Sequence, residues 1–204
     1  MRLVVVDYRI NNLGSLLRSI EFCGVIPIVA RCGNDLAFAD KIIVPGVGTF
    51  SDGMQKLIEF GFVEPLRHFA LVERKPILGI CLGMQLFAAK GFEPVECVGL
   101  GFFNFFAEKL CPTSEERLPH MGWNSIVKRG HSKLLLHIPE GADFYFVHSY
   151  GIKPESAAQN CVAAVNYSGG FTAVVEKDNI FGVQFHPEKS FPFGFQVLKN
   201  FLAL

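Results

Sequence analysis

The chain has 204 residues, half of them hydrophobic, which is enough for one domain with a packed core. Its 19 basic and 19 acidic residues give a net charge of zero, so the composition predicts no electrostatic attraction to nucleic acid or to an anionic membrane. No apolar run approaches the roughly 18 residues of a membrane span, and residues 1–7 indicate a first strand rather than a signal peptide.

The N-terminal half predicts strands and helices in alternation. A continuous β-branched run at 3–6 indicates a strand that is covered on both faces, and Asn11 or Asn12 can cap the helix that follows. Further strands are expected at 25–30, 41–44 and 77–80, and helical spacing extends from 51 to about 73 in two pieces broken near Gly61. This alternation is typical of a doubly wound α/β sheet, in which ligands bind beyond the carboxyl ends of the strands.

The C-terminal half predicts mostly strands. Apolar runs lie near 101–110, 143–147, 161–166, 172–177 and 180–185, with a weak helical stretch at 133–136 and a final amphipathic helix at about 194–202. We therefore expect one α/β domain over 1–204, with an open, doubly wound and mostly parallel sheet, helices on both faces and antiparallel additions in this half. The phenylalanines at 102, 103, 105 and 106 are expected on a strand, mainly as core residues.

The cysteines indicate a reducing compartment and single out one residue. The six of them (23, 32, 81, 97, 111 and 161) form no C-x-x-C pair and have no histidine at zinc-ligand spacing. A disulfide framework, a metal site and a cofactor are therefore not expected, and the predicted location is the cytoplasm. Five of the cysteines are expected to have packing roles, which leaves Cys81.

The residues around Cys81 form the pattern of a nucleophile elbow, a sharp turn between a strand and a helix. Glycines at 79 and 83, two residues on either side, allow the chain to turn without a Cβ collision. The turn would place the sulfur at a helix N-terminus, which favours a thiolate, and would direct the amide of Leu82 towards an oxyanion. The alternative is a buried structural cysteine in a glycine-rich turn.

Two further segments are candidates for catalysis. His186 and Glu188 are two residues apart after the last predicted strand, so the carboxylate can accept one ring N–H and leave the other nitrogen free for a nucleophile. Cys81, His186 and Glu188 would then form a triad, although a His-x-Glu pattern taken alone is more often a solvated turn. The loop Pro-Gly-Val-Gly at 45–48 could add the amide of Val47 as a second oxyanion donor, or could be an ordinary turn.

Five segments together resemble the class I, triad-type glutamine amidotransferases, whose motif G-x-C-x-G-x-Q matches residues 79–85. Within that family the chain is most similar to the glutaminase subunits of imidazole glycerol phosphate synthases, and the Pro-His-Met-Gly-Trp-Asn block at 119–124 is the most specific segment. The five segments span nearly the whole chain in the family's order: 45–48, 78–85, 119–124, 146–150 and 184–190.

The resemblance implies a reaction and a set of substrate contacts. Cys81 would attack the carboxamide of L-glutamine, His186 would protonate the departing ammonia, and water would release glutamate from a thioester. No cofactor is implied. The positions that would hold the glutamine backbone are Gly48, Gln85, Ser149 and Tyr150.

The resemblance also implies a partner, a cyclase subunit of the (β/α)₈ barrel type that uses the ammonia in a heterodimer. That subunit would form imidazole glycerol phosphate and an aminoimidazole carboxamide ribotide in histidine biosynthesis. The residues support a separate partner, because no P-loop, metal cluster or phosphate site remains unassigned and only 16 residues follow Glu188. The single tryptophan indicates an interface loop or, alternatively, a core position; the predicted interface is His120, Met121, Gly122, Trp123 and Asn124.

The chain departs from the family pattern in two places. The usual Asp-Tyr-Gly-x-Gly-Asn becomes Asp-Tyr-Arg-Ile-Asn-Asn at 7–12, and Gly151 replaces an aromatic residue. These changes make a paralogue that feeds a sugar amidotransferase of surface polysaccharide synthesis an alternative. A non-enzymatic elbow-cysteine α/β stress protein is a second alternative, which would lack the pair at 186 and 188. The glycines at 46 and 48 would allow the oxyanion loop to rest in a non-productive orientation until the partner's ligand binds.

Overall fold

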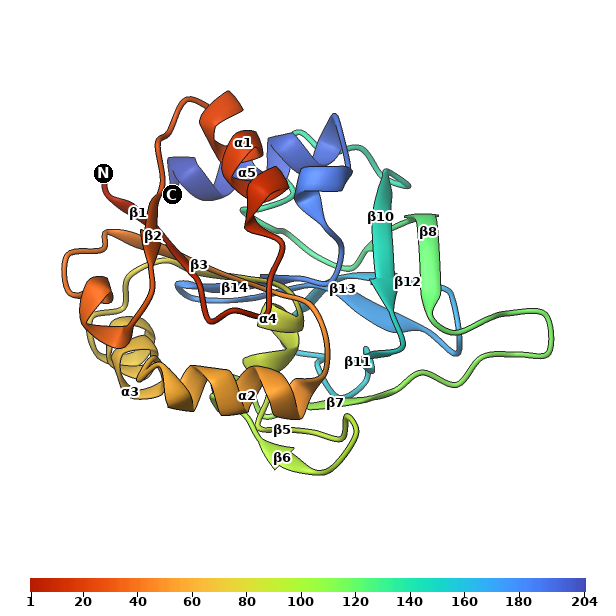
Figure 1. Cartoon of the computed structure of the whole chain (residues 1–204). Helices are drawn as coiled ribbons and strands as arrows, with labels where there is room; N and C mark the ends of the chain where they lie inside the picture. Colours follow the sequence, from red (N-terminus) through yellow and green to blue (C-terminus); the bar gives the residue numbers. More distant parts are fainter.

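An eight-stranded sheet forms the centre of the computed structural model, which describes residues 1–204 (Figure 1). Strands are parallel from β2 to β14 and antiparallel from β14 to the far edge, which confirms the predicted mostly parallel sheet with antiparallel additions. The order is β2 (Ile28–Ala30), β1 (Leu3–Val6), β3 (Lys41–Gly46), β4 (Ile77–Cys81), β14 (Ile180–Val183), β13 (Phe171–Lys177), β12 (Cys161–Val165) and β9 (Val127–Lys128).

Two smaller sheets lie beside the main one. The strands β8 (His120–Ser125) and β10 (Asp143–His148) form an antiparallel ribbon, which stands at one side of the molecule in Figure 1. The other sheet contains four short strands in the order β11 (Tyr150–Ile152), β7 (Phe106–Lys109), β5 (Lys90–Gly91) and β6 (Cys97–Val98).

Helices cover both faces of the main sheet, as predicted. In Figure 1, α1 and α5 lie above the sheet, whereas α2, α3 and α4 lie below it. Leu3 and Val5 of β1 join the core cluster on the α1 and α5 side, and Val4 and Val6 join the opposite one. No helix combines the length and the apolar character needed to cross a membrane. The α-helices are α1 (Leu13–Phe22), α2 (Phe50–Glu59), α3 (Val63–Arg67), α4 (Leu82–Leu86) and α5 (Phe193–Ala203). A π-helical segment, η2 (His68–Val72), follows α3, and η1 (Gly33–Leu36) and η3 (Pro187–Lys189) are short 3₁₀ helices.

The predicted strand at 101–110 was wrong over its first half. Only β7 is a strand there, and the amides of Phe102 and Phe103 donate instead to the carbonyl of Phe87 at the end of α4. The segment therefore wraps around that helix, and it still buries the side chains at 102, 103 and 105 while Phe106 is 40% exposed. The prediction that the aromatic run packs in the core is right for three of its four phenylalanines. The predicted reason, a strand over the whole run, was wrong.

The predicted helical stretch at 133–136 is a series of turns. The amides of Lys133 and Leu134 donate to the carboxylate of Glu176, both at 3.0 Å, and the amide of Leu135 donates to Ser132 Oγ. Side chains therefore satisfy the backbone donors that a helix would have bonded internally. His137 follows with φ +62°, which ends any helical path.

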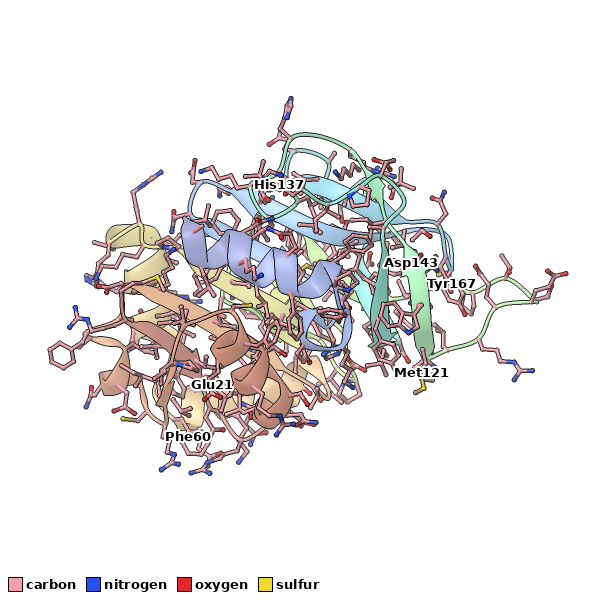
Figure 2. The ribbon with its side chains drawn as sticks, turned by 90° about the horizontal axis from the view of Figure 1, so that it is seen from above. Glu21, Phe60, Met121, His137, Asp143 and Tyr167 are labelled. Carbon is pink, nitrogen blue, oxygen red and sulfur yellow. The ribbon has the colours of Figure 1, made fainter.

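The segment at 120–125 is strand β8 rather than a loop. Burial alternates along it, with His120 buried and Met121 and Trp123 exposed by 64% and 55%. Figure 2 shows Met121 on the outer side of this ribbon, away from the body of the molecule. The alternative of a core tryptophan is therefore wrong.

Sheet register brings the candidate catalytic segments together. Gly46 of β3 pairs with Cys81 of β4, and Ile80 pairs with Val183 of β14. The carboxyl ends of three neighbouring parallel strands therefore meet at one place, where ligands bind in open α/β sheets. The segment after β14 carries His186 to the same edge.

The elbow glycines are required by space. A Cβ on Gly83 would overlap the carbonyl oxygen of Val44, and one on Gly79 would lie 2.7 Å from the backbone of Gly83. Neither glycine has a positive φ, so close approach of backbones is the reason for both. The strained backbone belongs to Cys81 itself, with φ +55° and ψ −112°.

Candidate active site

Cys81 lies at the bend between β4 and α4 and is only 5% exposed. Its sulfur has two polar neighbours. The thiol faces the carbonyl of Val147 at 4.0 Å, and Nε2 of Gln184 donates to the sulfur at 3.6 Å. The strained bend therefore presents the sulfur to polar groups of β10 and of the segment that follows β14.

His186 and Glu188 form a buried pair, with Nδ1 and Oε1 2.9 Å apart and side chains 5% and 7% exposed. The predicted reason was wrong, because residues 187–189 form the 3₁₀ turn η3 and not an extended chain. Two hydrogen bonds to the backbone of His186 hold this turn in place. The amide of His186 donates to the carbonyl of Tyr145 at 3.0 Å, and Ser190 Oγ donates to the carbonyl of His186 at 2.7 Å.

The electrostatics of His186 suit an acid–base partner of the sulfur. Its Nε2 is buried and has no hydrogen-bond partner, while Nδ1–H is held by the carboxylate. Burial alone lowers the pKa of His186, but the negative charge of the Cys81 sulfur and the Glu188 carboxylate outweigh it and raise the pKa above its usual value. This direction favours the protonated imidazolium form of His186.

A cavity of about 260 Å³ opens beside Cys81. Its size suits a ligand of amino-acid dimensions. The structure brings together here all the residues predicted as oxyanion donors or substrate contacts. The lining residues are Val47, Gly48, Cys81, Leu82, Gln85, Glu93, Val147, His148, Ser149 and Tyr150.

Two titratable residues of this cavity were not expected from the sequence. Glu93 is half-buried, and burial raises its pKa. His148 is buried, which lowers its pKa to about 3 and keeps the ring neutral. Glu93 lies in an irregular segment after β5 without any motif, so only the tertiary structure identifies it. His148 lies two residues before Tyr150, a predicted substrate contact, and this spacing could have suggested that His148 also lies at the cavity.

The Val47 amide is not directed into the cavity in this conformation. Its N–H donates to the carbonyl of Ile10 at 3.2 Å, and the Val47 side chain is 39% exposed. The amide that was predicted as the second oxyanion donor is therefore occupied elsewhere in this conformation. That the loop rests in a non-productive orientation until the partner's ligand binds stays a prediction.

The altered loop at 9–12 is held by its own side chains. Arg9 adopts φ +69°, a conformation that glycine accepts more readily, and its amide donates to Asp7 Oδ1 at 3.1 Å. Asn11 Nδ2 donates to the carbonyl of Val6 at 3.3 Å. Asn12 precedes α1, but its side chain makes no capping hydrogen bond, contrary to the expected cap. The loop thus presents the Ile10 carbonyl to Val47 without any glycine.

The predicted interface segment is divided between two environments. His120 is buried, with Nδ1 3.4 Å from His148 Nε2, and Asn124 Nδ2 lies 3.4 Å from His120 Nε2. Trp123 packs edge-on against Tyr145, with ring centroids 6.2 Å apart, and Lys189 lies over the same ring. The exposed face of β8 therefore continues into the turn that carries the His186–Glu188 pair.

The cysteines and acidic residues show no other reactive centre. All six cysteines are free, and no group of three or more His, Cys, Asp or Glu side chains is arranged to hold a metal ion.

Comparisons with known proteins agree with one another. The family model for "Glutamine amidotransferase class-I" matches residues 4–204. The chain is 42% identical over 202 residues to "Imidazole glycerol phosphate synthase subunit HisH 1" of Campylobacter jejuni strain RM1221, covering 99% of this chain and all of that protein. It is 39% identical over 204 residues to "Imidazole glycerol phosphate synthase subunit HisH" of Pectobacterium atrosepticum, with complete coverage of both.

Solved structures with low sequence identity share the fold. A chain of PurLQS from Thermotoga maritima has a TM-score of 0.73 at 19% identity, with 99% of this chain and 97% of that chain covered. A structure described as a glutamine amidotransferase has a TM-score of 0.67 at 16% identity, with 98% and 97% covered.

Proposed function

This chain belongs to the class I glutamine amidotransferases, and from that premise we propose that it is the glutaminase subunit of an imidazole glycerol phosphate synthase in histidine biosynthesis. The observation that carries the proposal is the cavity beside Cys81, which combines the candidate nucleophile with the substrate contacts implied by the family. The His186–Glu188 pair lines an adjoining cavity, and the two cavities share Val47 and Val147. Full-length relatives named as that subunit support the choice within the family. The whole range 1–204 is taken as one glutaminase domain.

The proposed chemistry proceeds through a thioester. The Cys81 thiolate attacks the carboxamide carbon of glutamine, and the resulting oxyanion is stabilised by the amide of Leu82 and, after reorientation, by that of Val47. The imidazolium of His186 protonates the leaving nitrogen, which departs as ammonia. His186 then takes a proton from water, which attacks the thioester and releases glutamate and the thiolate. Glu188 holds Nδ1–H throughout.

Glu93 gives the cavity a charge that suits an amino acid. Its carboxylate lines the cavity opposite no cationic side chain, since Glu93 forms no ion pair. The α-ammonium of a bound glutamine would supply the missing cation. Gln85, Ser149 and Tyr150 remain the proposed contacts for the rest of the backbone.

Glu93→Gln is expected to raise KM for glutamine about tenfold while kcat changes less than threefold. The change removes a charge-assisted contact to the substrate, which is made equally in the ground state and the transition state. Steady-state glutaminase kinetics in the presence of the partner would measure both constants. Glu96→Gln is a matched control, because Glu96 is exposed and pairs with Lys90 outside the cavity. An unchanged KM in the Glu93 variant would contradict the contact.

The ammonia would be used by a partner subunit, and we propose a cyclase of the (β/α)₈ barrel type. The exposed Met121 and Trp123 of β8 and Lys189 on the adjoining turn form the proposed contact surface. Aromatic residues and methionine are enriched in the cores of protein interfaces. The cytoplasm is the predicted compartment for this heterodimer.

Neither alternative considered from the sequence is favoured. The relatives named above are subunits of imidazole glycerol phosphate synthase, so they do not support a surface polysaccharide paralogue. A non-enzymatic elbow-cysteine protein would lack the buried His186–Glu188 pair.

A reconstituted synthesis tests the proposal. The chain is mixed with a cyclase subunit of imidazole glycerol phosphate synthase and its ribulosyl-type phosphoribosyl carboxamide substrate, and glutamate and both cyclase products are measured. Glutamine-dependent formation of the products is the expected result. Rapid ester hydrolysis without glutamine turnover would reject the assignment to glutaminases, and glutaminase activity that no such cyclase stimulates would reject the partner.

A further inference from the structure

A glutamine outside the proposed triad lies against the candidate nucleophile. Gln184 directly follows β14 and is completely buried. Its Nε2 donates to the sulfur of Cys81 at 3.6 Å, and its Oε1 accepts from Nε2 of Gln85 at 3.0 Å. Because Val183 pairs with Ile80, the next residue of each strand, Gln184 and Cys81, lie side by side at the edge of the sheet.

A backbone carbonyl sets the direction of these hydrogen bonds. Nε2 of Gln85 donates to the carbonyl of Tyr150 at 2.8 Å, and a carbonyl can only accept. The second N–H of the same nitrogen then points to Gln184, so the side-chain oxygen of Gln184 must be the acceptor. The amide nitrogen of Gln184 is left to face the sulfur. Reversing either side chain would place two donors or two acceptors against each other.

The Tyr150 carbonyl is fixed by a second donor. His148 Nδ1 lies 2.8 Å from it, and the neutral ring carries its hydrogen on that nitrogen in order to donate. Burial lowers the pKa of His148 to about 3, so this neutral form persists at physiological pH. The peptide cannot rotate without breaking hydrogen bonds to two buried side chains.

The two polar neighbours of the sulfur respond differently to its ionisation. The neutral thiol can donate to the carbonyl of Val147 at 4.0 Å, but a thiolate has no hydrogen to give and is repelled by that oxygen. The N–H of Gln184 remains a donor in both states, and its hydrogen bond strengthens when the acceptor is charged. The glutamine therefore stabilises the thiolate more than the thiol.

We propose that Gln184 is a positioning residue that holds the Cys81 sulfur as a hydrogen-bond acceptor, in the reactive thiolate form, with its own polarity set by the Tyr150 carbonyl through Gln85. Its part in glutamine hydrolysis rests on the proposed function. The role requires a side chain that accepts from Gln85 and also donates an N–H to the sulfur. Both contacts are made by the terminal amide, so the side chain must have the length of glutamine.

Alkylation of Cys81 by iodoacetamide tests this role without substrate or partner. The rate at pH 7 is followed on the peptide that contains Cys81 by mass spectrometry, because Cys32 and Cys111 are exposed and also react. Gln184→Met keeps the length of the side chain and removes the N–H. The alkylation rate of Cys81 is expected to fall about tenfold or more, because a hydrogen bond to a charged group is lost. With the partner, kcat for glutamine is expected to fall by a similar factor.

Two controls separate positioning from folding. Thr172→Val is also completely buried, on the neighbouring strand β13, and removes a hydroxyl that has no hydrogen-bond partner, so both rates are expected to stay within twofold. Gln184→Asn keeps the amide but shortens its reach, and it is expected to lose rate as Gln184→Met does. Circular dichroism and co-elution with the cyclase verify the fold of each variant. If the Met variant does not fold, the alkylation rate of the Asn variant decides.

The possible outcomes separate the two claims. A folded Gln184→Met variant that alkylates within twofold of the unchanged chain overturns the positioning role, whether or not glutamine is hydrolysed. Slow alkylation of this variant supports the role. If the unchanged chain hydrolyses no glutamine with the cyclase, the proposed function fails while the alkylation result still decides how the sulfur is held.

Discussion

Cys81→Ala is expected to abolish glutamine-dependent synthesis by the complex, with a fall of at least about 10⁴-fold in kcat. The variant removes the nucleophile of the proposed thioester route, and loss of a nucleophile in a triad has effects of this order or larger. Product formation with glutamine as the nitrogen source measures the change. The side chain is buried and small, so alanine leaves the surrounding sheet intact.

Ammonia supplies the internal control for this variant. Synthesis from added ammonium salt is expected to proceed at the rate of the unchanged complex, because the acceptor chemistry belongs to the partner. Cys97→Ala provides a matched substitution at a half-buried cysteine outside the cavity and is expected to change neither activity. Loss of both activities in the Cys81 variant would contradict separate sites for the two reactions.

Val47→Pro is expected to lower partner-stimulated glutamine turnover by about 10²–10³-fold, the effect of removing one oxyanion donor. Proline lacks the N–H that now donates to the carbonyl of Ile10 and that, in the proposed reaction, turns towards the substrate oxygen. For the same reason, the chain alone is expected to hydrolyse glutamine more slowly than the complex with its cyclase ligand, by a similar factor. Steady-state kinetics of the chain with and without the partner measure both effects.

Val47→Ala is the matched control, because it keeps the amide while it removes a side chain that is 39% exposed. Its turnover is expected to remain within about threefold. Co-elution of each variant with the cyclase in gel filtration reports whether the complex still assembles. Full-speed turnover by the chain alone would show that the hydrogen bond to Ile10 does not limit the reaction.

Local patterns were enough to predict much of the fold. The β-branched run at 3–6 and the alternation of strands and helices gave the parallel half of the sheet, because period and composition report burial on two faces. Predictions failed where a group from another segment accepted the backbone N–H groups, a carboxylate side chain in one case and a backbone carbonyl in the other. Glu176 holds the turns at 133–135, and the end of α4 captures residues 102 and 103.

The candidate site likewise contains residues that local spacing predicted and a residue that only the tertiary structure identified. Spacing was sufficient to select Cys81, His186 and Glu188, although the pair meets through a 3₁₀ turn rather than along a strand. Nothing in the sequence indicated that Glu93 lines the cavity. Its segment is irregular, and its position depends on how β5 packs beside the main sheet.

The sequence by itself determined the candidate reactive groups and the bend that carries Cys81, because these depend on residue type and on steric rules that act over a few positions. Tertiary structure alone decided that the Val47 amide donates to Ile10 and that Gln184 faces the sulfur. Those contacts join residues that are 37 and 103 positions apart. Their geometry is set by sheet register and by buried donors that each require an acceptor, and no local pattern encodes either.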